Sequence, residues 1–185
     1  MMSNTIAIQY YKSPVGELVL GDFNDQLCLC DWRYRSMRTE VDARIRKGLA
    51  AVFEEKPTPL LTETQNQLQA YFDRKLNAFT IPLLLVGTPF QQTVWKALQA
   101  VPYGKTQTYM GLSKHLDNPK AIRAVAAANG ANAIAILIPC HRIIGSNQEL
   151  VGYAGGLPAK KKLLALEQGN QLELFDDLNG QSREK

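Results

Sequence analysis

The spacing of apolar residues changes at Gly87-Thr88-Pro89, and this change divides the chain into parts that must fold differently. Before this point, short apolar runs bounded by turn residues predict strands over residues 6–11, 17–20, 26–32 and 81–86. Helices are expected over residues 39–54 and 63–74, with a break at Pro57-Thr58-Pro59. We therefore expect a mixed α/β domain over residues 1–86, a second domain over residues 87–170 and a flexible tail over residues 171–185.

Helical spacing dominates the second part. One apolar stripe ends at Pro102-Tyr103-Gly104 and contains Phe90, Val94, Leu98 and Val101. Thr108 is the expected N-cap of the next helix, and Asn118-Pro119 is expected to begin a helix that runs to about Asn129. Two short helices joined by a tight turn predict a helix-turn-helix. The expected fold class is thus α+β with two domains, of which the second is mainly helical.

The helix expected after Asn118 has two different sides. At about 100° per residue, one side carries Ile122, Val125, Ala126 and Asn129, and the other carries Lys120, Arg123, Ala124 and Ala127. Small side chains let a helix backbone come close to DNA, and cations meet phosphates or enter a groove. The alternative is that alanine is present only because it favours helices.

Charge is distributed unevenly along the chain. Residues 87–170 carry nine Lys/Arg and three Asp/Glu, whereas residues 1–86 carry ten of each. A basic half beside a neutral half predicts a polyanionic partner, with ordinary surface variation as the alternative. No apolar run approaches the ~20 residues of a membrane span, and neither a signal peptide nor an even cysteine count is present. We expect a cytoplasmic monomer with reduced thiols and no membrane attachment.

The segment Pro139-Cys140-His141-Arg142 follows an apolar run and carries the chemistry. Proline restricts the backbone before the cysteine, and the cationic neighbours are expected to favour the nucleophilic thiolate. A buried structural cysteine is the alternative, but it needs neither the proline nor adjacent charge. His141 is the candidate base, because the other histidine, His115, lies on a helix rich in polar residues. Glu167 could orient His141, although a surface glutamate is the commoner interpretation of its spacing.

Several separated motifs resemble the methylated-DNA–protein-cysteine methyltransferases, also called alkylguanine-DNA alkyltransferases. They are Pro139-Cys140-His141-Arg142, Gly152-Tyr153-Ala154-Gly155-Gly156-Leu157, Pro102-Tyr103-Gly104, Tyr109 and the stretch from Asn118 to Val125. The resemblance covers roughly residues 87–169 and is strongest to the bacterial stand-alone members. The first half is similar only in length and general pattern, which in this family implies a ribonuclease-H-like fold.

The resemblance implies a reaction and a role for each site residue. Cys140 would accept the alkyl group from the oxygen-6 of guanine irreversibly, so that each molecule acts once. His141, held by Glu167, would draw the Cys140 proton through a water. Asn132 would organise the turn of the active site. Tyr109 would assist rotation of the nucleotide and donate a proton to the departing guanine.

The resemblance also implies how the protein meets double-stranded DNA. The second helix of the helix-turn-helix would lie in the minor groove, where Arg123 would fill the space left by the flipped nucleotide. Further DNA contacts are expected from Lys120, Asn118 and Ser146. The lesion pocket would have walls formed by Tyr153, Gly155 and Gly156.

Two features depart from the family pattern, and neither implies a cofactor. Asn132-Ala133 stands where members often have Asn-Pro, which implies a less rigid turn. Cys28 and Cys30 lie in the first half without a histidine, so a four-ligand zinc site is not supported and no metal is expected.

Three other functions are open on the sequence alone. A sensor of alkylated DNA would bind the lesion without repairing it, but such relatives lack the acceptor cysteine. A helix-turn-helix regulator would need neither Cys140-His141 nor the glycine-rich loop, and sequence-specific binding would reveal one. A cysteine hydrolase would turn over an acyl substrate repeatedly, and the usual order of its triad has no good match here.

Overall fold

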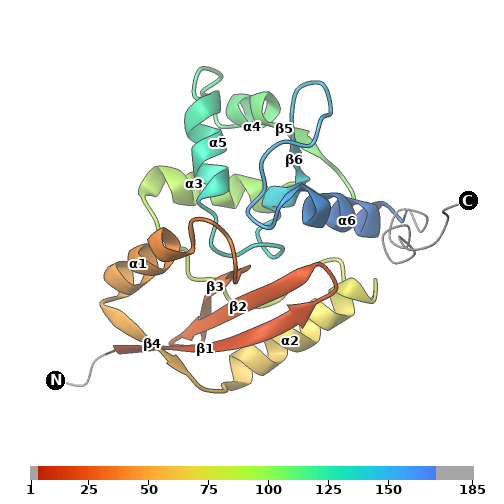
Figure 1. Cartoon of the computed structure of the whole chain (residues 1–185). Helices are drawn as coiled ribbons and strands as arrows, with labels where there is room; N and C mark the ends of the chain where they lie inside the picture. Colours follow the sequence, from red (N-terminus) through yellow and green to blue (C-terminus); the bar gives the residue numbers. More distant parts are fainter. Residues whose placement is uncertain (1–3, 170–185) are drawn as a thin grey trace, which may run out of the picture.

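The computed structural model describes residues 4–169, so the tail expected at residues 171–185 lies outside the described part. The N-terminal half (residues 4–86) contains β1 (Asn4–Ser13), β2 (Gly16–Phe23), β3 (Gln26–Trp32), α1 (Arg38–Leu49), β4 (Ala51–Glu55) and α2 (Pro59–Phe72). The C-terminal half (residues 87–169) contains α3 (Pro89–Gln99), β5 (Gln107–Thr108), α4 (Tyr109–His115), α5 (Ile122–Gly130), the 3₁₀ turn η1 (Cys140–Arg142), β6 (Ile143–Ile144) and α6 (Leu157–Gln168). Figure 1 shows the sheet of the first half below the helices of the second.

The N-terminal half is a four-stranded sheet covered by one helix on each face. The strand order is β3-β2-β1-β4, with β1 antiparallel to β2 and parallel to β4. Because successive side chains of a strand point to opposite faces, Leu18 and Leu20 join the core that contains α2, while Val19 joins the core that contains α1. The mixed α/β architecture expected from the sequence is therefore confirmed.

Three expectations for the N-terminal half are wrong in detail. The helix expected over residues 63–74 already begins at Pro59, because Thr58 caps it by accepting a hydrogen bond from Leu61 N (3.1 Å). The helix expected over residues 39–54 ends at Leu49, because Ala50 takes a left-handed conformation (φ 47°) and the following residues form β4 beside β1. The strand expected over residues 81–86 makes a single bridge, at Leu83, to the edge of β3. Pro82 has no N–H to donate, although its carbonyl accepts a hydrogen bond from Leu27 (2.8 Å).

The C-terminal half follows the expected helices with two exceptions. A capping box at Thr88 begins α3, and Thr108 caps α4 by accepting a hydrogen bond from Gly111 N (2.9 Å). Phe90 was expected in the apolar stripe of α3, but its side chain faces solvent and is 39% exposed. The expected cap at Asn118 is also wrong: α5 begins at Ile122, because Asn118 O accepts from Ala121 N (3.0 Å) in a turn that precedes the helix.

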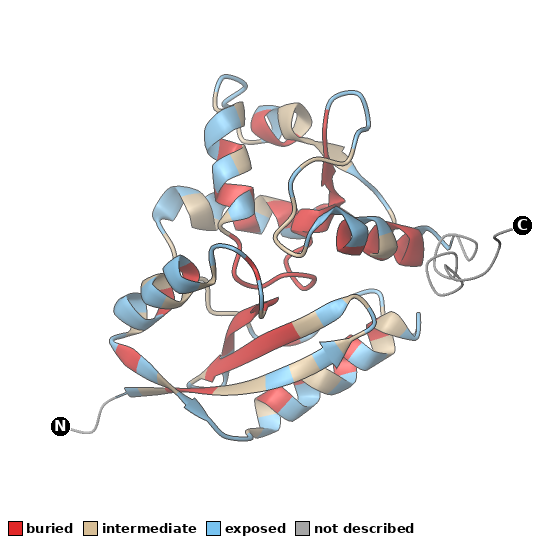
Figure 2. Ribbon diagram, viewed as in Figure 1, coloured by how far each residue is buried: buried red, intermediate tan, exposed pale blue. Residues whose placement is uncertain are grey.

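The chain between α5 and η1 crosses from the helical layer to the sheet. Residues 132–139 are buried, as the red segment between the two halves shows (Figure 2). Cys30 N in β3 donates to Ala133 O (2.9 Å), and Ala135 N donates to Cys30 O (2.6 Å). An edge strand of the N-terminal half thus fixes the segment that leads to Cys140.

No helix within residues 4–169 has the length and apolar character that crossing a membrane would require.

Candidate active site

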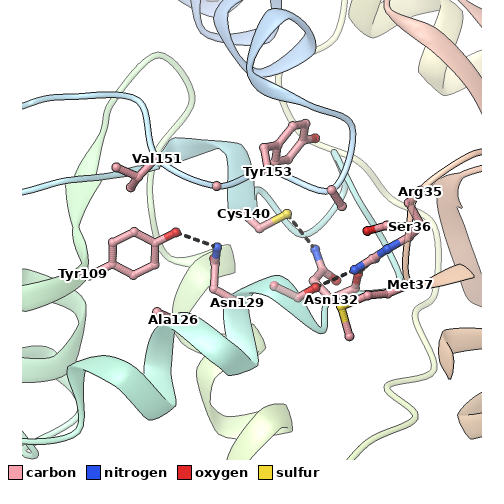
Figure 3. Close-up of a pocket in the computed structure, with 13 residues that line it drawn as sticks. Arg35, Ser36, Met37, Tyr109, Ala126, Asn129, Asn132, Cys140, Val151 and Tyr153 are labelled. Atoms are coloured by element: carbon pink, nitrogen blue, oxygen red, sulfur yellow. Dashed lines mark hydrogen bonds between the residues drawn. The ribbon is translucent and has the colours of Figure 1, made fainter.

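Cys140 lies at the bottom of a cavity between the two halves. It is the first residue of η1, and its side chain is almost fully buried. The cavity has a volume of about 440 Å³ and is lined by residues of both halves, among them Arg35, Ser36, Met37, Tyr109, Asn132 and Tyr153 (Figure 3). A group held in this cavity would therefore lie within reach of the sulfur.

Asn132 connects the turn after α5 to the cysteine. Its Nδ2 donates to Ile138 O (2.9 Å) and lies 3.2 Å from Cys140 Sγ, while its Oδ1 accepts from Ile134 N (2.9 Å). The dashed line between Asn132 and Cys140 in Figure 3 marks the contact to sulfur. Because Asn132 bonds on both sides of the buried segment, it fixes the orientation of the thiol.

The expectation that neighbouring cations lower the pKa of Cys140 is wrong. Burial raises this pKa to about 11, and the hydrogen bond from Asn132 opposes the rise only in part. His141 is uncharged in its buried position, and the Arg142 guanidinium is directed to Glu167. The thiol is therefore the resting form, and a base must take its proton before it can attack.

Glu167, near the end of α6, binds both residues that follow the cysteine. Its Oε1 lies 2.7 Å from His141 Nε2, and its Oε2 accepts from Arg142 Nε (2.8 Å). Tyr71 Oη and Gly104 N donate to the same carboxylate (2.8 and 3.1 Å). Burial disfavours the charged carboxylate, but the bonds and charges of His141 and Arg142 outweigh it and lower the pKa of Glu167 to about 2.

The ionised carboxylate determines which tautomer of His141 is present. A carboxylate only accepts hydrogen bonds, so the proton of the neutral ring must be on Nε2. The other ring nitrogen, Nδ1, is buried and has no hydrogen-bond partner among residues 4–169. Burial lowers the pKa of His141, and Glu167 opposes this in part. The ring is thus a neutral base with one nitrogen available for a proton.

The remaining residues singled out in the sequence lie in three places. Tyr109 is half-buried at the cavity, where its Oη accepts from Asn129 Nδ2 (3.3 Å). Arg123, Ala124 and Ala127 form the exposed side of α5, as expected, and the exposed residues Lys120, Asn118 and Ser146 lie in loops. Tyr153 is at the cavity, Gly155 packs on Trp32, and Gly156 (φ 83°) precedes α6. His115, by contrast, is exposed at the end of α4.

Four residues of the site were missed by sequence reasoning. Arg35 and Met37 line the cavity from the N-terminal half, and Tyr71 reaches Glu167 from α2. Lys160 is fully buried and donates to Ile143 O (2.5 Å) and Val151 O (2.7 Å), and burial lowers its pKa to about 8. In the sequence Lys160 begins a run of three lysines, which is typical of an exposed helix face, so no signal distinguishes it.

A buried cysteine, held by an amide and placed next to a neutral histidine that is bound to a carboxylate, has the parts of a protein that uses a thiol as its nucleophile. Comparison with known sequences identifies the family within this class. Residues 6–85 match the model described as "6-O-methylguanine DNA methyltransferase, ribonuclease-like domain", and residues 89–169 match its "DNA binding domain". The chain belongs to the 6-O-methylguanine DNA methyltransferase family.

Individual relatives are similar over almost the whole chain. Proteins named methylated-DNA–protein-cysteine methyltransferase are 49% identical in Mycobacterium leprae (89% of this chain and 95% of the relative) and 41% identical in Methanosarcina acetivorans (85% and 95%). The crystal structure of Mycobacterium tuberculosis OGT in complex with DNA superposes with a TM-score of 0.77 at 37% identity, covering 92% of this chain and 99% of that one.

Proposed function

We propose that this protein repairs DNA by transferring an alkyl group from the oxygen-6 of guanine to its own Cys140, as a methylated-DNA–[protein]-cysteine S-methyltransferase (EC 2.1.1.63). The observation that carries the proposal is the position of Cys140: its thiol lines a cavity between the two halves and lies beside a neutral histidine, in a chain of this family. An alkyl group on the oxygen-4 of thymine would be a second substrate for the same chemistry.

The reaction is a displacement at the alkyl carbon that the residues of this chain perform without a cofactor. The Cys140 proton moves to His141 Nδ1 through a water, and Glu167 stabilises the resulting imidazolium. Sulfur then forms a bond to the carbon as the carbon–oxygen bond breaks and its electron pair stays with guanine. Tyr109, whose pKa is raised by burial, is a neutral donor that can give its proton to the departing base. The product is a thioether, so one molecule repairs one lesion.

The C-terminal half would bind DNA through α4 and α5, which pack against each other and form the proposed helix-turn-helix. Base chemistry inside a duplex requires the nucleotide to be flipped out. Arg123, on the exposed small-residue side of α5, would fill the vacated space from the minor groove, and Lys120, Asn118 and Ser146 would contact the backbone. The similar Mycobacterium tuberculosis OGT was crystallised in complex with DNA, which supports this partner.

The flipped base would enter the cavity that ends at Cys140. Tyr153 lies at this cavity, and the Gly155-Gly156 turn leads from it to α6. We also propose that the domains divide at residues 86 and 87 and that the protein acts as a cytoplasmic monomer. Residues 1–86 would be the supporting domain and residues 87–170 the one that carries the chemistry.

The test is the mass of the intact protein after reaction with excess duplex that contains O6-methylguanine. We expect a gain of one methyl group, located by peptide mapping at Cys140 and absent from Cys140→Ala. The alternative function, a sensor of alkylation damage, predicts tight binding to the lesion without any gain in mass. That result would exclude the transfer reaction.

A further inference from the structure

The end of helix α5 is held by side chains from the other half of the molecule. Arg35 Nη2 donates to Gly130 O (2.7 Å), and Arg35 Nη1 donates to Asn132 O (3.1 Å). Arg44 Nη2, from α1, donates to the carbonyl between them, Ala131 O (2.7 Å). Three consecutive carbonyls therefore receive hydrogen bonds from two arginines of the N-terminal half.

The position of these arginines suits the electrostatics of a helix end. The last carbonyls of a helix have no partner within it and carry partial negative charge, so guanidinium groups stabilise them. Arg35 is itself fixed by an ion pair with Asp31 (2.8 Å), which is fully buried. Arg44 lies over the ring of Trp95 at 5.4 Å, and Trp95 Nε1 donates to Ala128 O (2.8 Å) in the same helix end. Both guanidinium groups are thus held in one orientation.

Asn132 is the last of the three residues whose carbonyls accept hydrogen bonds from these arginines, and its side chain contacts Cys140 Sγ. Figure 3 shows the bond from Arg35 to Asn132 beside the bond from Asn132 to Cys140. On the basis of the proposed function, we propose that Arg35 and Arg44 are positioning residues for alkyl transfer, which hold the Asn132 turn so that its amide keeps Cys140 oriented. The N-terminal half is then part of the active site rather than only a support.

A direct role in DNA binding is the competing explanation for Arg35, because Arg35 also lines the cavity. Its two terminal nitrogens already donate to Asp31, Gly130 and Asn132, and its side chain is only 4% exposed. A DNA contact would have to displace these bonds. The two explanations differ in the step they affect, since positioning alters the chemical step and a phosphate contact alters affinity.

The first experiment compares Arg35→Met and Arg44→Met with two matched controls. Arg33→Met removes a half-buried arginine from the same loop, where it pairs with Glu17, and Arg46→Met removes an exposed arginine from α1. Single-turnover transfer from an O6-methylguanine duplex is measured at saturating DNA, and affinity by fluorescence anisotropy. We expect the transfer rate of the two test variants to fall about ten- to hundredfold with little change in Kd, because small misplacements of reacting groups have effects of this size. A raised Kd at an unchanged saturating rate would overturn the proposal.

The second experiment is a double-mutant cycle with Asn132→Ala. If Arg35 acts through Asn132, Arg35→Met should change the transfer rate by less than about twofold in the Asn132→Ala background. If the two substitutions instead lowered the transfer rate independently, so that their effects multiplied in the double variant, the proposal would be contradicted. Arg35→Lys keeps the charge beside Asp31, so it serves if Arg35→Met does not fold, and its rate should lie between those of the parent and Asn132→Ala. An inactive parent protein would instead refute the proposed function. The failure of the proposed function can therefore be distinguished from the failure of the positioning role.

Discussion

The chemistry of individual residues in this protein follows from burial. Cys140, His141 and Glu167 are all buried, yet burial acts on them in different directions. It keeps the thiol protonated and the imidazole neutral, whereas the partners of Glu167 overcome its effect and keep the carboxylate charged. In the resting site, Cys140 is therefore a neutral acid and His141 a neutral base, and the negative charge of Glu167 lies on the other side of the imidazole ring.

Replacement of Glu167 by glutamine tests the importance of that charge. Glu167→Gln leaves the Arg142 guanidinium buried without its counterion, which typically costs about 3–5 kcal/mol of stability. It also removes the group that stabilises protonated His141, so we expect transfer to slow at least about a hundredfold. Urea unfolding and single-turnover rates measure the two effects. Glu149→Gln, at an exposed position, is the control, and equal effects in both variants would contradict this account of Glu167.

The pH dependence of transfer should report on His141. A base must be unprotonated to act, and the pKa of His141 in the folded protein is lowered from its usual value of about 6.5. The transfer rate at saturating DNA should thus stay constant as pH falls from 8 to about 6.5 and decrease only below this range. A decrease that begins above pH 7 would show that His141 is not the base or that its pKa is not lowered.

At the residue scale, local motifs and distant partners differ in how far they can be predicted. Cys140 and His141 were found because proline, thiol, imidazole and guanidinium are adjacent in the sequence. Glu167 depended on resemblance to a family, since it lies 26 residues from His141. Arg35 could not be found, because its partner Asn132 is 97 residues away and no local pattern marks a buried arginine.

Among the elements, α5 shows what periodicity can and cannot predict. The exposed side was predicted correctly for Arg123, Ala124 and Ala127, because helical geometry alone determines which residues share a side. Lys120, expected on the same side, lies before the helix. The start of the helix was wrong, because the turn at Asn118 depends on a backbone hydrogen bond that Asn118 and Pro119 do not reveal. In the same way, β4 was predicted as helix because pairing with β1 overrides a weak local preference.

A negative charge on the exposed side of α5 tests its role in DNA binding. Ala127→Glu should weaken binding to duplex DNA roughly tenfold at moderate salt, because the carboxylate would face phosphates. Its free energy of unfolding should change by less than about 0.5 kcal/mol, as is usual at exposed positions. Fluorescence anisotropy gives the affinity. Ala43→Glu introduces the same charge on the exposed side of α1, and similar weakening there would argue against α5 as the DNA-binding helix.

For the molecule as a whole, the sequence predicted two parts but not how they meet. Periodicity reports on single elements, whereas the contact between halves depends on side chains that fit across them. Trp32 and Gly155 are such a pair: a Cβ atom on Gly155 would overlap the Trp32 ring, so only glycine allows the loop to pack there. The Trp32 ring also meets Tyr153 edge to face at 5.8 Å.

A substitution at this contact should affect stability through both halves. Gly155→Ala is expected to lower the free energy of unfolding by about 1–3 kcal/mol, because the methyl group overlaps the indole and overpacking has costs of this size. In a Trp32→Leu background, which removes the ring, the same substitution should cost less. Urea unfolding of the four proteins in this cycle provides the test. Equal costs in both backgrounds would show that the overlap is relieved without moving Trp32.

The pairing of β3 with the segment before Cys140 has a consequence for biosynthesis. The ribosome completes the sheet of the N-terminal half well before it makes Ala133 and Ala135, the partners of Cys30. Until then the strand edge at Cys30 is open, and open edges recruit strands of other chains. A nascent or truncated N-terminal half is therefore expected to self-associate, and the segment that leads to Cys140 closes the edge when synthesis is complete.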